Sequence, residues 1–271
     1  MRGSGQRNGE SARGMTALDD AVFAFCAARA FRPHWPEIPA AWRPTSIPEG
    51  YRLQRAIHER LADQGVRRVG YKIGSTAPVN QRPWGLTEPV YAGIFTDTRA
   101  ETLTAALARP LLHPSLECEV AFRLRRDIDG ADPALSAATI LDAIAACYIA
   151  CEIIDNRYDA PGEIGVPTLL ADDFFQAGFV LGAAHPAWRT LDFGALEGTI
   201  EIDGVLTSGS ASDTMDAISA MLWLARKLGI NDANLREGEI ILTGSFTRPV
   251  RVTPLARAVS LTISGFTPLT L

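Results

Sequence analysis

Two glutamates separated by one residue offer the clearest chemistry in this sequence. Glu117 and Glu119 lie in the stretch PSLECEVAF (residues 114–122), where apolar and polar residues alternate. This period of two is typical of a β-strand, and it places both carboxylates on one face, about 7 Å apart at their Cα atoms. Because like charges repel strongly in a low dielectric, a half-buried pair requires a nearby cation. The pair therefore predicts two oxygen ligands for a hard divalent metal.

The same pair could instead form a solvated strand face, with Arg123, Arg125 and Arg126 neutralising it. Glu152 bears on this choice, because it is the only charged residue in the apolar stretch 143–154. A lone carboxylate in such a stretch costs several kcal/mol unless it is paired or bound to a metal. Glu152 is therefore either a further metal ligand or the partner of an arginine from elsewhere in the chain.

A lysine between two glycines is a candidate acid/base group. Lys72 alternates with Tyr71 and Ile73 in the short stretch GYKIG (residues 70–74), which favours a strand with Lys72 on its own side. The flanking glycines allow a ligand or another backbone to come close. A desolvated lysine has a lowered pKa and can exchange protons with a substrate. The alternative is a lysine that simply faces water.

Composition excludes several classes of protein. The chain has 271 residues, of which 47% are apolar and 21% charged, as in an ordinary globular protein. Its net charge of −5 gives no basic surface for nucleic acid, and its longest apolar run, residues 143–151, is too short to span a membrane. We see no signal peptide and no C-x-x-C pair among the four cysteines, so we expect a cytoplasmic protein with reduced cysteines.

The elements that must position these groups begin after a helical start. Residues 1–14 are rich in Gly, Ser and Arg and are expected to be a disordered leader. Residues 15–65 predict an N-terminal helical segment, with helices at 16–30 and 48–63 and a proline-rich connector between them. Strand-like alternation fills residues 66–271, which we expect to form the catalytic domain.

Within that domain the pattern predicts strands, two helices and one long loop. The loop is residues 159–171, whose prolines and glycines favour a lid. The helices are expected at 136–147 and 214–228. Strands are expected at 69–74, 116–124, 148–155, 178–182, 199–205, 239–243 and 259–263, with a hairpin turn at 203–204.

Four stretches, in their order and spacing, resemble the hydratase/decarboxylase branch of the fumarylacetoacetate hydrolase superfamily. They are GYKIG (70–74), PSLECEVAF (114–122), ACEIIDNRY (150–158) and EIILTGSFTRPV (239–250). The resemblance runs from about residue 51 to the C-terminus. It implies an α+β fold, in which residues 66–271 form a mixed, curled β-sheet roll with helices packed on it.

The resemblance also implies a site. Glu117, Glu119 and Glu152 would bind Mg²⁺ or Mn²⁺, and Lys72 would be the catalytic acid/base. Three carboxylates leave room in an octahedral shell for water and a bidentate 2-oxo acid. The backbone and hydroxyl at 244–245 could hold the substrate carboxylate, although an ordinary hairpin turn is the alternative there. The substrate-binding residues that we expect are Tyr71, Asp172, Asp173, Gly244 and Ser245.

The implied activity is that of a lyase acting on a small 2-oxo acid. A hydratase would add water to a 2-hydroxy-2,4-dienoate, or to its 2-oxo-3-enoate form, and so produce a 4-hydroxy-2-oxo acid in the degradation of an aromatic compound. The alternatives are a decarboxylase of a 2-oxo-3-enedioate, of the 4-oxalocrotonate type, and a non-catalytic homologue that binds small acids. The resemblance further implies a homo-oligomer, and we expect neither a nucleic acid nor a membrane as partner.

Departures from the family pattern lie around the substrate. Val90 stands where hydratases usually carry Asp, and decarboxylase-like members have an apolar residue there. Residues 171–175 read ADDFF where relatives have ADNAS, which predicts a pocket of different size and polarity. The lysine-bearing lid of the superfamily's C–C hydrolases is not visible between residues 155 and 177, which argues against acylpyruvate hydrolysis.

Overall fold

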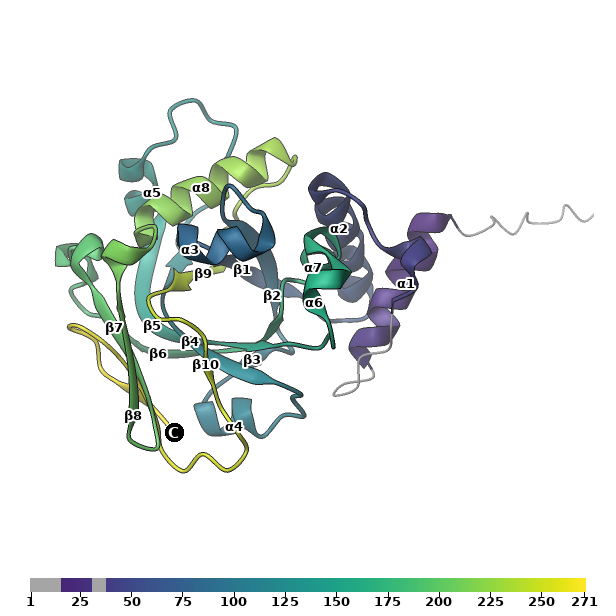
Figure 1. Cartoon of the computed structure of the whole chain (residues 1–271). Coiled ribbons are helices and arrows are strands. Elements are labelled where there is room, and N and C mark those ends of the chain that lie inside the picture. Colours follow the sequence, from purple (N-terminus) through teal and green to yellow (C-terminus); the bar gives the residue numbers. More distant parts are fainter. Residues whose placement is uncertain (1–15, 31–37) are drawn as a thin grey trace, which may run out of the picture.

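A computed structural model describes residues 16–30 and 38–271, and it shows an α+β protein built around a curled sheet (Figure 1). The expected leader at residues 1–14 lies outside the described residues. Eight strands form the main sheet, in the order β2-β1-β9-β4-β5-β6-β3 with β10 beside β4. The sheet is mixed, because β1–β9 and β3–β6 are parallel while its other pairs are antiparallel. The expected fold class is confirmed.

The longest strands of the main sheet, β4 and β5, lie near its centre. Its strands are β1 (Arg68–Gly74), β2 (Val90–Phe95), β3 (Arg99–Ala100), β4 (Pro114–Leu124), β5 (Ile144–Asp155), β6 (Gln176–Ala184), β9 (Ile240–Ser245) and β10 (Val250–Arg251). A smaller sheet has the order β12-β11-β7-β8. Its strands are β7 (Glu197–Ile202), β8 (Val205–Ser210), β11 (Val259–Ile263) and β12 (Leu269–Thr270). The hairpin expected at residues 203–204 joins β7 to β8.

Helices pack over the main sheet, and the first two in chain order lie beside its β2 edge (Figure 1). They are α1 (Ala17–Ala30), α2 (Ile47–Asp63), α3 (Pro78–Gln81), α4 (Leu103–Leu107), α5 (Ala137–Ala143), α6 (Pro161–Ile164), α7 (Val166–Ala171) and α8 (Ala217–Ile230). None of the helices described is long and apolar enough to cross a membrane.

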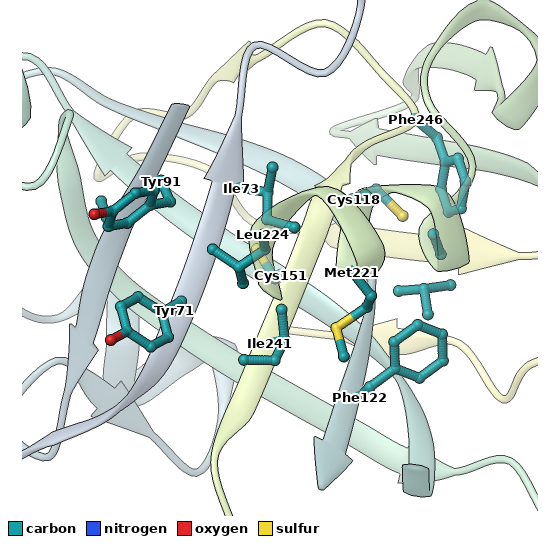
Figure 2. Close-up of a cluster of buried hydrophobic side chains, with 14 of the residues drawn as sticks. Tyr71, Ile73, Tyr91, Cys118, Phe122, Cys151, Met221, Leu224, Ile241 and Phe246 are labelled. Carbon is teal, nitrogen blue, oxygen red and sulfur yellow. The ribbon is translucent and has the colours of Figure 1, made fainter. Parts of the chain in front are cut away.

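The core forms where α8 lies on the sheet. Figure 2 shows Met221 and Leu224 of α8 among side chains of β4 and β9, including Phe122 and Ile241. On β4 the apolar residues that alternate with the glutamates, from Leu116 to Leu124, are buried in the same cluster. The period of two in the sequence therefore separates the two faces of the strand, with the large apolar residues on one face and the glutamates on the other.

The N-terminal helices pack on a second hydrophobic cluster. Phe25 of α1 and Ile57 of α2 are buried there together with Phe95 of β2 and Ala171 of α7. Ser46 caps α2 by accepting a hydrogen bond from the Glu49 N–H, as expected for a helix N-terminus. This packing ties α1 and α2 to the edge of the main sheet where β2 and α7 lie.

Two local expectations need correction. The helix expected at 136–147 ends at Ala143, and β5 begins at Ile144. Alanine and isoleucine fit either element, so the pairing of β5 with β4 decides the boundary. The loop expected at 159–171 contains α6 and α7, and the last four residues of α7 are buried. Its second half, α7, packs against α2 and is therefore not an open lid.

Candidate active site

Three glutamates converge on the concave side of the main sheet. Glu117 and Glu119 of β4 and Glu152 of β5 each offer a carboxylate oxygen, and these three atoms lie within 4.8 Å of one another. Glu119 is 1% exposed, Glu152 is 0% exposed, and Glu117 is partly buried. Strand alternation explains the placement of the first two, and antiparallel pairing brings the third opposite Glu117.

The arginines near this cluster in sequence do not neutralise it. Arg125 and Arg126 pair with Asp142 at the exposed end of α5. Arg123 is exposed. The ion-pair partner of Glu152 is a lysine, not an arginine. Within residues 16–30 and 38–271, neither alternative considered for these glutamates is found: they do not form a solvated face, and no arginine pairs with Glu152.

Lys72 of β1 completes the cluster. Its Nζ lies 3.3 Å from Glu152 Oε1, and the side chain is only 3% exposed. The ammonium also lies 5.3 Å from the centre of the Phe174 ring, a cation–π distance. Gly74, at the end of the same strand, faces the Phe174 side chain, and a Cβ there would lie 3.3 Å from the ring, a tight contact. The alternative that Lys72 faces water is thus excluded.

The pKa values of these groups reflect burial and mutual charge. Burial raises the pKa of each glutamate, and repulsion from Glu152 raises the pKa of Glu117 further, to about 8. Burial alone would lower the pKa of Lys72, but attraction to the three carboxylates outweighs it and raises that pKa. The carboxylates alone thus shift the pKa of Lys72 in the direction opposite to the one that the sequence suggested.

The donor set fits a hard divalent cation. Neither carboxylate oxygen of Glu152 accepts a hydrogen bond of good geometry from the described part of the chain, although both are buried. Glu119 Oε2 accepts one hydrogen bond, from the Gly244 N–H at 2.8 Å, which orients that carboxylate. Buried oxygen donors left without hydrogen-bond donors are what Mg²⁺ or Mn²⁺ requires, and softer metals prefer nitrogen or sulfur.

A cavity of about 230 Å³ opens beside Lys72 and Glu117. Its size suits a small acid, because pockets for drug-sized ligands begin at about 300 Å³. The remaining lining residues come from strand ends, from α3 and the 3-10 helix that follows it, and from loops, and most of them are apolar. They are Gly74, Ser75, Asn80, Pro83, Trp84, Ile154, Phe174, Phe175 and Pro249.

Tyr71, Gly244 and Ser245 do not line this cavity. Tyr71 points to the opposite side of β1 from Lys72 and packs against Tyr91 with ring centres 5.9 Å apart (Figure 2). The turn expected at residues 244–245 is not found, because both residues lie in strand β9. The Gly244 N–H is used by Glu119, and the Ser245 hydroxyl donates to the Cys118 carbonyl.

Asp172 and Asp173, expected to bind substrate, are buried and do not line this cavity. Asp172 pairs with Arg157 at 2.7 Å. Asp173 pairs with Arg29 of α1 and lies 2.8 Å from His58 Nε2 of α2. Both carboxylates hold helices and turns together, and they reach the cavity only through the residue that follows them, Phe174.

Sequence reasoning missed part of the cavity wall. Trp84 lies in a short 3-10 helix (Arg82–Trp84), a segment for which no element was expected from the sequence. Phe174 and Phe175 were visible as a departure from the family pattern, but their packing against Trp84 was not. A bulky aromatic pair at a position where relatives carry small residues was the available signal.

Curated proteins with similar sequences decide the family. The chain is 31% identical over 214 residues to the 2-keto-4-pentenoate hydratase of Paraburkholderia xenovorans (strain LB400), a match that covers 77% of each chain. The chain belongs to the hydratase/decarboxylase branch of the fumarylacetoacetate hydrolase superfamily. A second member, the 4-oxalocrotonate decarboxylase of a Pseudomonas species, is 28% identical over 211 residues, covering 77% of this chain and 80% of its own. Both named activities belong to lyases, and this family member is a lyase.

Solved structures agree on the fold. The 4-oxalocrotonate decarboxylase from Pseudomonas putida G7, complexed with magnesium and adipate, matches with a TM-score of 0.80 at 20% identity, covering 95% of this chain and 98% of that one. No protein-family model matches the chain. This likeness shows that the two proteins share the same fold.

Proposed function

We propose that this family member is a metal-dependent hydratase that converts a 2-hydroxy-2,4-dienoate to a 4-hydroxy-2-oxo acid in the degradation of an aromatic compound. One observation carries the proposal: Glu117, Glu119, Glu152 and Lys72 cluster beside a small cavity, and neither carboxylate oxygen of Glu152 accepts a hydrogen bond of good geometry from the described residues. The hydratases among its relatives support the reaction. The cavity of about 230 Å³ suits a small acid such as this dienoate.

Glu117, Glu119 and Glu152 are proposed to hold one Mg²⁺ or Mn²⁺. When bound, such a cation supplies positive charge close to the oxygen atoms of a 2-oxo acid, where negative charge develops during the reaction. The Gly244 N–H fixes the Glu119 carboxylate, so this ligand is oriented before any cation binds.

Lys72 is proposed to move the protons. Conversion of the dienol to a 2-oxo-3-enoate takes a proton from the 2-hydroxyl group and adds one at the far carbon. Water then adds across the remaining double bond, with its oxygen at C4 and a proton at C3. Lys72 Nζ is the one ammonium that lines the cavity among the described residues, and it can hold or return these protons. Such acid/base catalysis contributes about 10²–10⁴-fold.

Decarboxylation of a 2-oxo-3-enedioate is the second candidate. The observation that favours it is Val90, a buried apolar residue where hydratases usually carry Asp. The Val90 side chain lies next to Gly74, and Gly74 lines the cavity, so Val90 borders the site. Water addition and loss of CO₂ would both use the same cation and the same lysine.

The test is product analysis with the Mg²⁺- or Mn²⁺-loaded protein. We expect the ultraviolet band of 2-hydroxypenta-2,4-dienoate to disappear and the product to be heavier by one water. A product lighter by CO₂ from a 2-oxo-3-enedioate, with no water addition, would favour the second candidate. Saturable binding without turnover of either substrate would contradict both and indicate a non-catalytic homologue.

We also propose that the protein forms a homo-oligomer, as the family resemblance implies. Light scattering of the purified chain tests this, and a mass equal to one chain would contradict it.

A further inference from the structure

The cavity beside Lys72 has an aromatic wall. Trp84, Phe174 and Phe175 contact one another, with ring centres between 5.3 and 5.9 Å apart in tilted or edge-on arrangements. Among the residues that line the cavity, Lys72 and Glu117 carry charge, and both belong to the metal cluster. Away from that cluster, the lining therefore offers a ligand apolar surface with two neutral polar residues, Ser75 and Asn80.

A turn with unusual backbone geometry presents this wall. Asp173, Phe174 and Phe175 have φ angles of 55°, 45° and 68°, so three consecutive residues with side chains adopt the left-handed conformation. Each such residue costs about 1–2 kcal/mol relative to the right-handed form. A turn of this kind persists only where the surrounding structure fixes it, and such turns occur preferentially at functional sites.

Buried contacts fix the turn from several sides. Asp173 Oδ1 accepts a hydrogen bond from the Gly93 N–H at 2.7 Å and lies 2.8 Å from His58 Nε2, while Oδ2 pairs with Arg29. The Phe175 carbonyl accepts a hydrogen bond of 2.9 Å from the Asp155 N–H. The backbone that carries Phe174 and Phe175 is therefore held in place from several sides.

In the part of the chain that the structure describes, no cation other than Lys72 lines this space to meet a distant carboxylate. Arg82 and Arg248 precede the lining residues Pro83 and Pro249, but both arginines are exposed and neither lines the cavity. A carboxylate against the aromatic wall would lose water without gaining a cation, which is costly. The faces of aromatic rings also carry partial negative charge and repel anions.

We propose that the wall formed by Trp84, Phe174 and Phe175 determines specificity for 2-oxo acids with an uncharged tail, and selects against substrates with a second carboxylate. This inference rests on the proposed function and specifies its substrate class. The wall packs against the apolar tail of a 2-hydroxy-2,4-dienoate, while the glutamate cluster and Lys72 serve its 2-oxo acid end.

The test compares two ligands of equal length by calorimetry on the Mn²⁺-loaded protein. 2-Oxopentanoate and 2-oxoglutarate have the same carbon chain and differ in the terminal carboxylate. We expect 2-oxopentanoate to bind at least tenfold more tightly. Equal affinity, or tighter binding of 2-oxoglutarate, would overturn the inference.

Pyruvate separates this inference from the proposed function, because it has the 2-oxo acid group and no long tail. If pyruvate and both longer acids fail to bind, the proposed function falls and the inference falls with it. If pyruvate binds and the two longer acids bind equally, the proposed function stands and only the inference is overturned.

Variants locate the discrimination. Phe175→Lys places a cation on the wall and is expected to raise the affinity for 2-oxoglutarate at least tenfold without changing the affinity for pyruvate. Trp84→Lys tests the same point outside the left-handed turn, should the first variant fold poorly. Arg248→Ala is the control and should change neither affinity. Loss of 2-oxoglutarate binding in Arg248→Ala alone would show that an arginine receives the second carboxylate, contrary to the inference.

Discussion

Glu117 lies directly opposite Glu152 across the antiparallel pairing of β4 with β5. Because side chains alternate along a strand, a shift of this pairing by one residue would turn Glu152 to the other face and remove it from the cluster. The long apolar faces of both strands, which include Cys118 and Cys151, fix the pairing from the core side. The packing of the core thereby places the proposed metal ligands.

The first prediction concerns removal of the metal. Chelation should lower the melting temperature, because a cation that binds the folded protein and not the unfolded chain stabilises the fold. Adding Mn²⁺ at about 100 times its dissociation constant should restore about 2.7 kcal/mol of stability. Differential scanning calorimetry with and without chelator measures this.

The matched variants for that experiment are Glu119→Gln and Glu201→Gln. Glu119→Gln removes a ligand and should abolish the shift in melting temperature. Glu201 is an exposed residue of β7, so its variant should keep the whole shift. An undiminished shift in Glu119→Gln would mean that the cation binds elsewhere.

The second prediction concerns Lys72. Lys72→Met should lower kcat by about 10²–10⁴-fold, because it removes the proposed proton carrier. The affinity for Mn²⁺ should be retained, since the three glutamates remain. Lys227→Met is the control, because Lys227 pairs with Glu88 away from the cavity. If Lys72→Met turned over substrate at the wild-type rate with the metal bound, Lys72 could not be the acid/base group.

The third prediction concerns pH. Burial by itself raises the pKa of Asp173, but His58, Arg29 and the Gly93 N–H lower it to about 2. The pKa of Asp173 in the folded protein thus lies below the unfolded value of about 4. The ionised Asp173 carboxylate therefore stabilises the protein fully above about pH 5. This contribution, about 2 kcal/mol, should disappear as the pH falls from 5 to 2.

Denaturant unfolding of wild type and Asp173→Asn at several pH values, with chelator present throughout, isolates this effect. At pH 7 the variant should be less stable by about 3 kcal/mol, because Arg29 and His58 lose a buried anion. The difference should shrink toward pH 2. A difference that stays constant with pH would contradict the assigned ion pairs, and Asp63→Asn at the exposed end of α2 serves as the control.

The glutamate cluster proposed to bind the metal could be predicted from sequence because its signals are local. The alternation around Glu117 and Glu119 and the isolation of Glu152 are each visible within about ten residues. The register that sets Glu152 opposite Glu117 is not, because it depends on which residues of two separate strands pair. The family resemblance supplied what the local pattern could not.

The burial of Asp173, in contrast, could not be predicted from the sequence around it. Its partners Arg29 and His58 are 144 and 115 residues away in the sequence, so nothing near Asp173 indicates that it is an internal anchor. A polar residue beside a loop is by default expected to face solvent or substrate. Its role became visible only when α1 and α2 were seen to pack beside α7.

The fourth prediction concerns Gly244. A Cβ at this position would lie 2.6 Å from the Thr76 side chain, and the residue has a φ of 105°. Gly244→Ala should therefore displace the N–H that orients Glu119 and weaken Mn²⁺ binding at least tenfold. Gly204→Ala also changes a glycine with positive φ, but its Cβ would meet open space, so it should cost only about 1–2 kcal/mol of stability. Equal Mn²⁺ affinities in the two variants would argue against a role for the Gly244 N–H.

The central claim is that Glu117, Glu119 and Glu152 bind one divalent cation on which water addition depends. The most direct measurement titrates the metal-free protein with Mn²⁺, following the bound cation by electron paramagnetic resonance and the loss of the dienoate ultraviolet band in the same samples. We predict that both signals saturate together at one Mn²⁺ per chain, and that Glu119→Gln loses both. Full turnover in the presence of chelator, or undiminished turnover by Glu119→Gln, would contradict the claim.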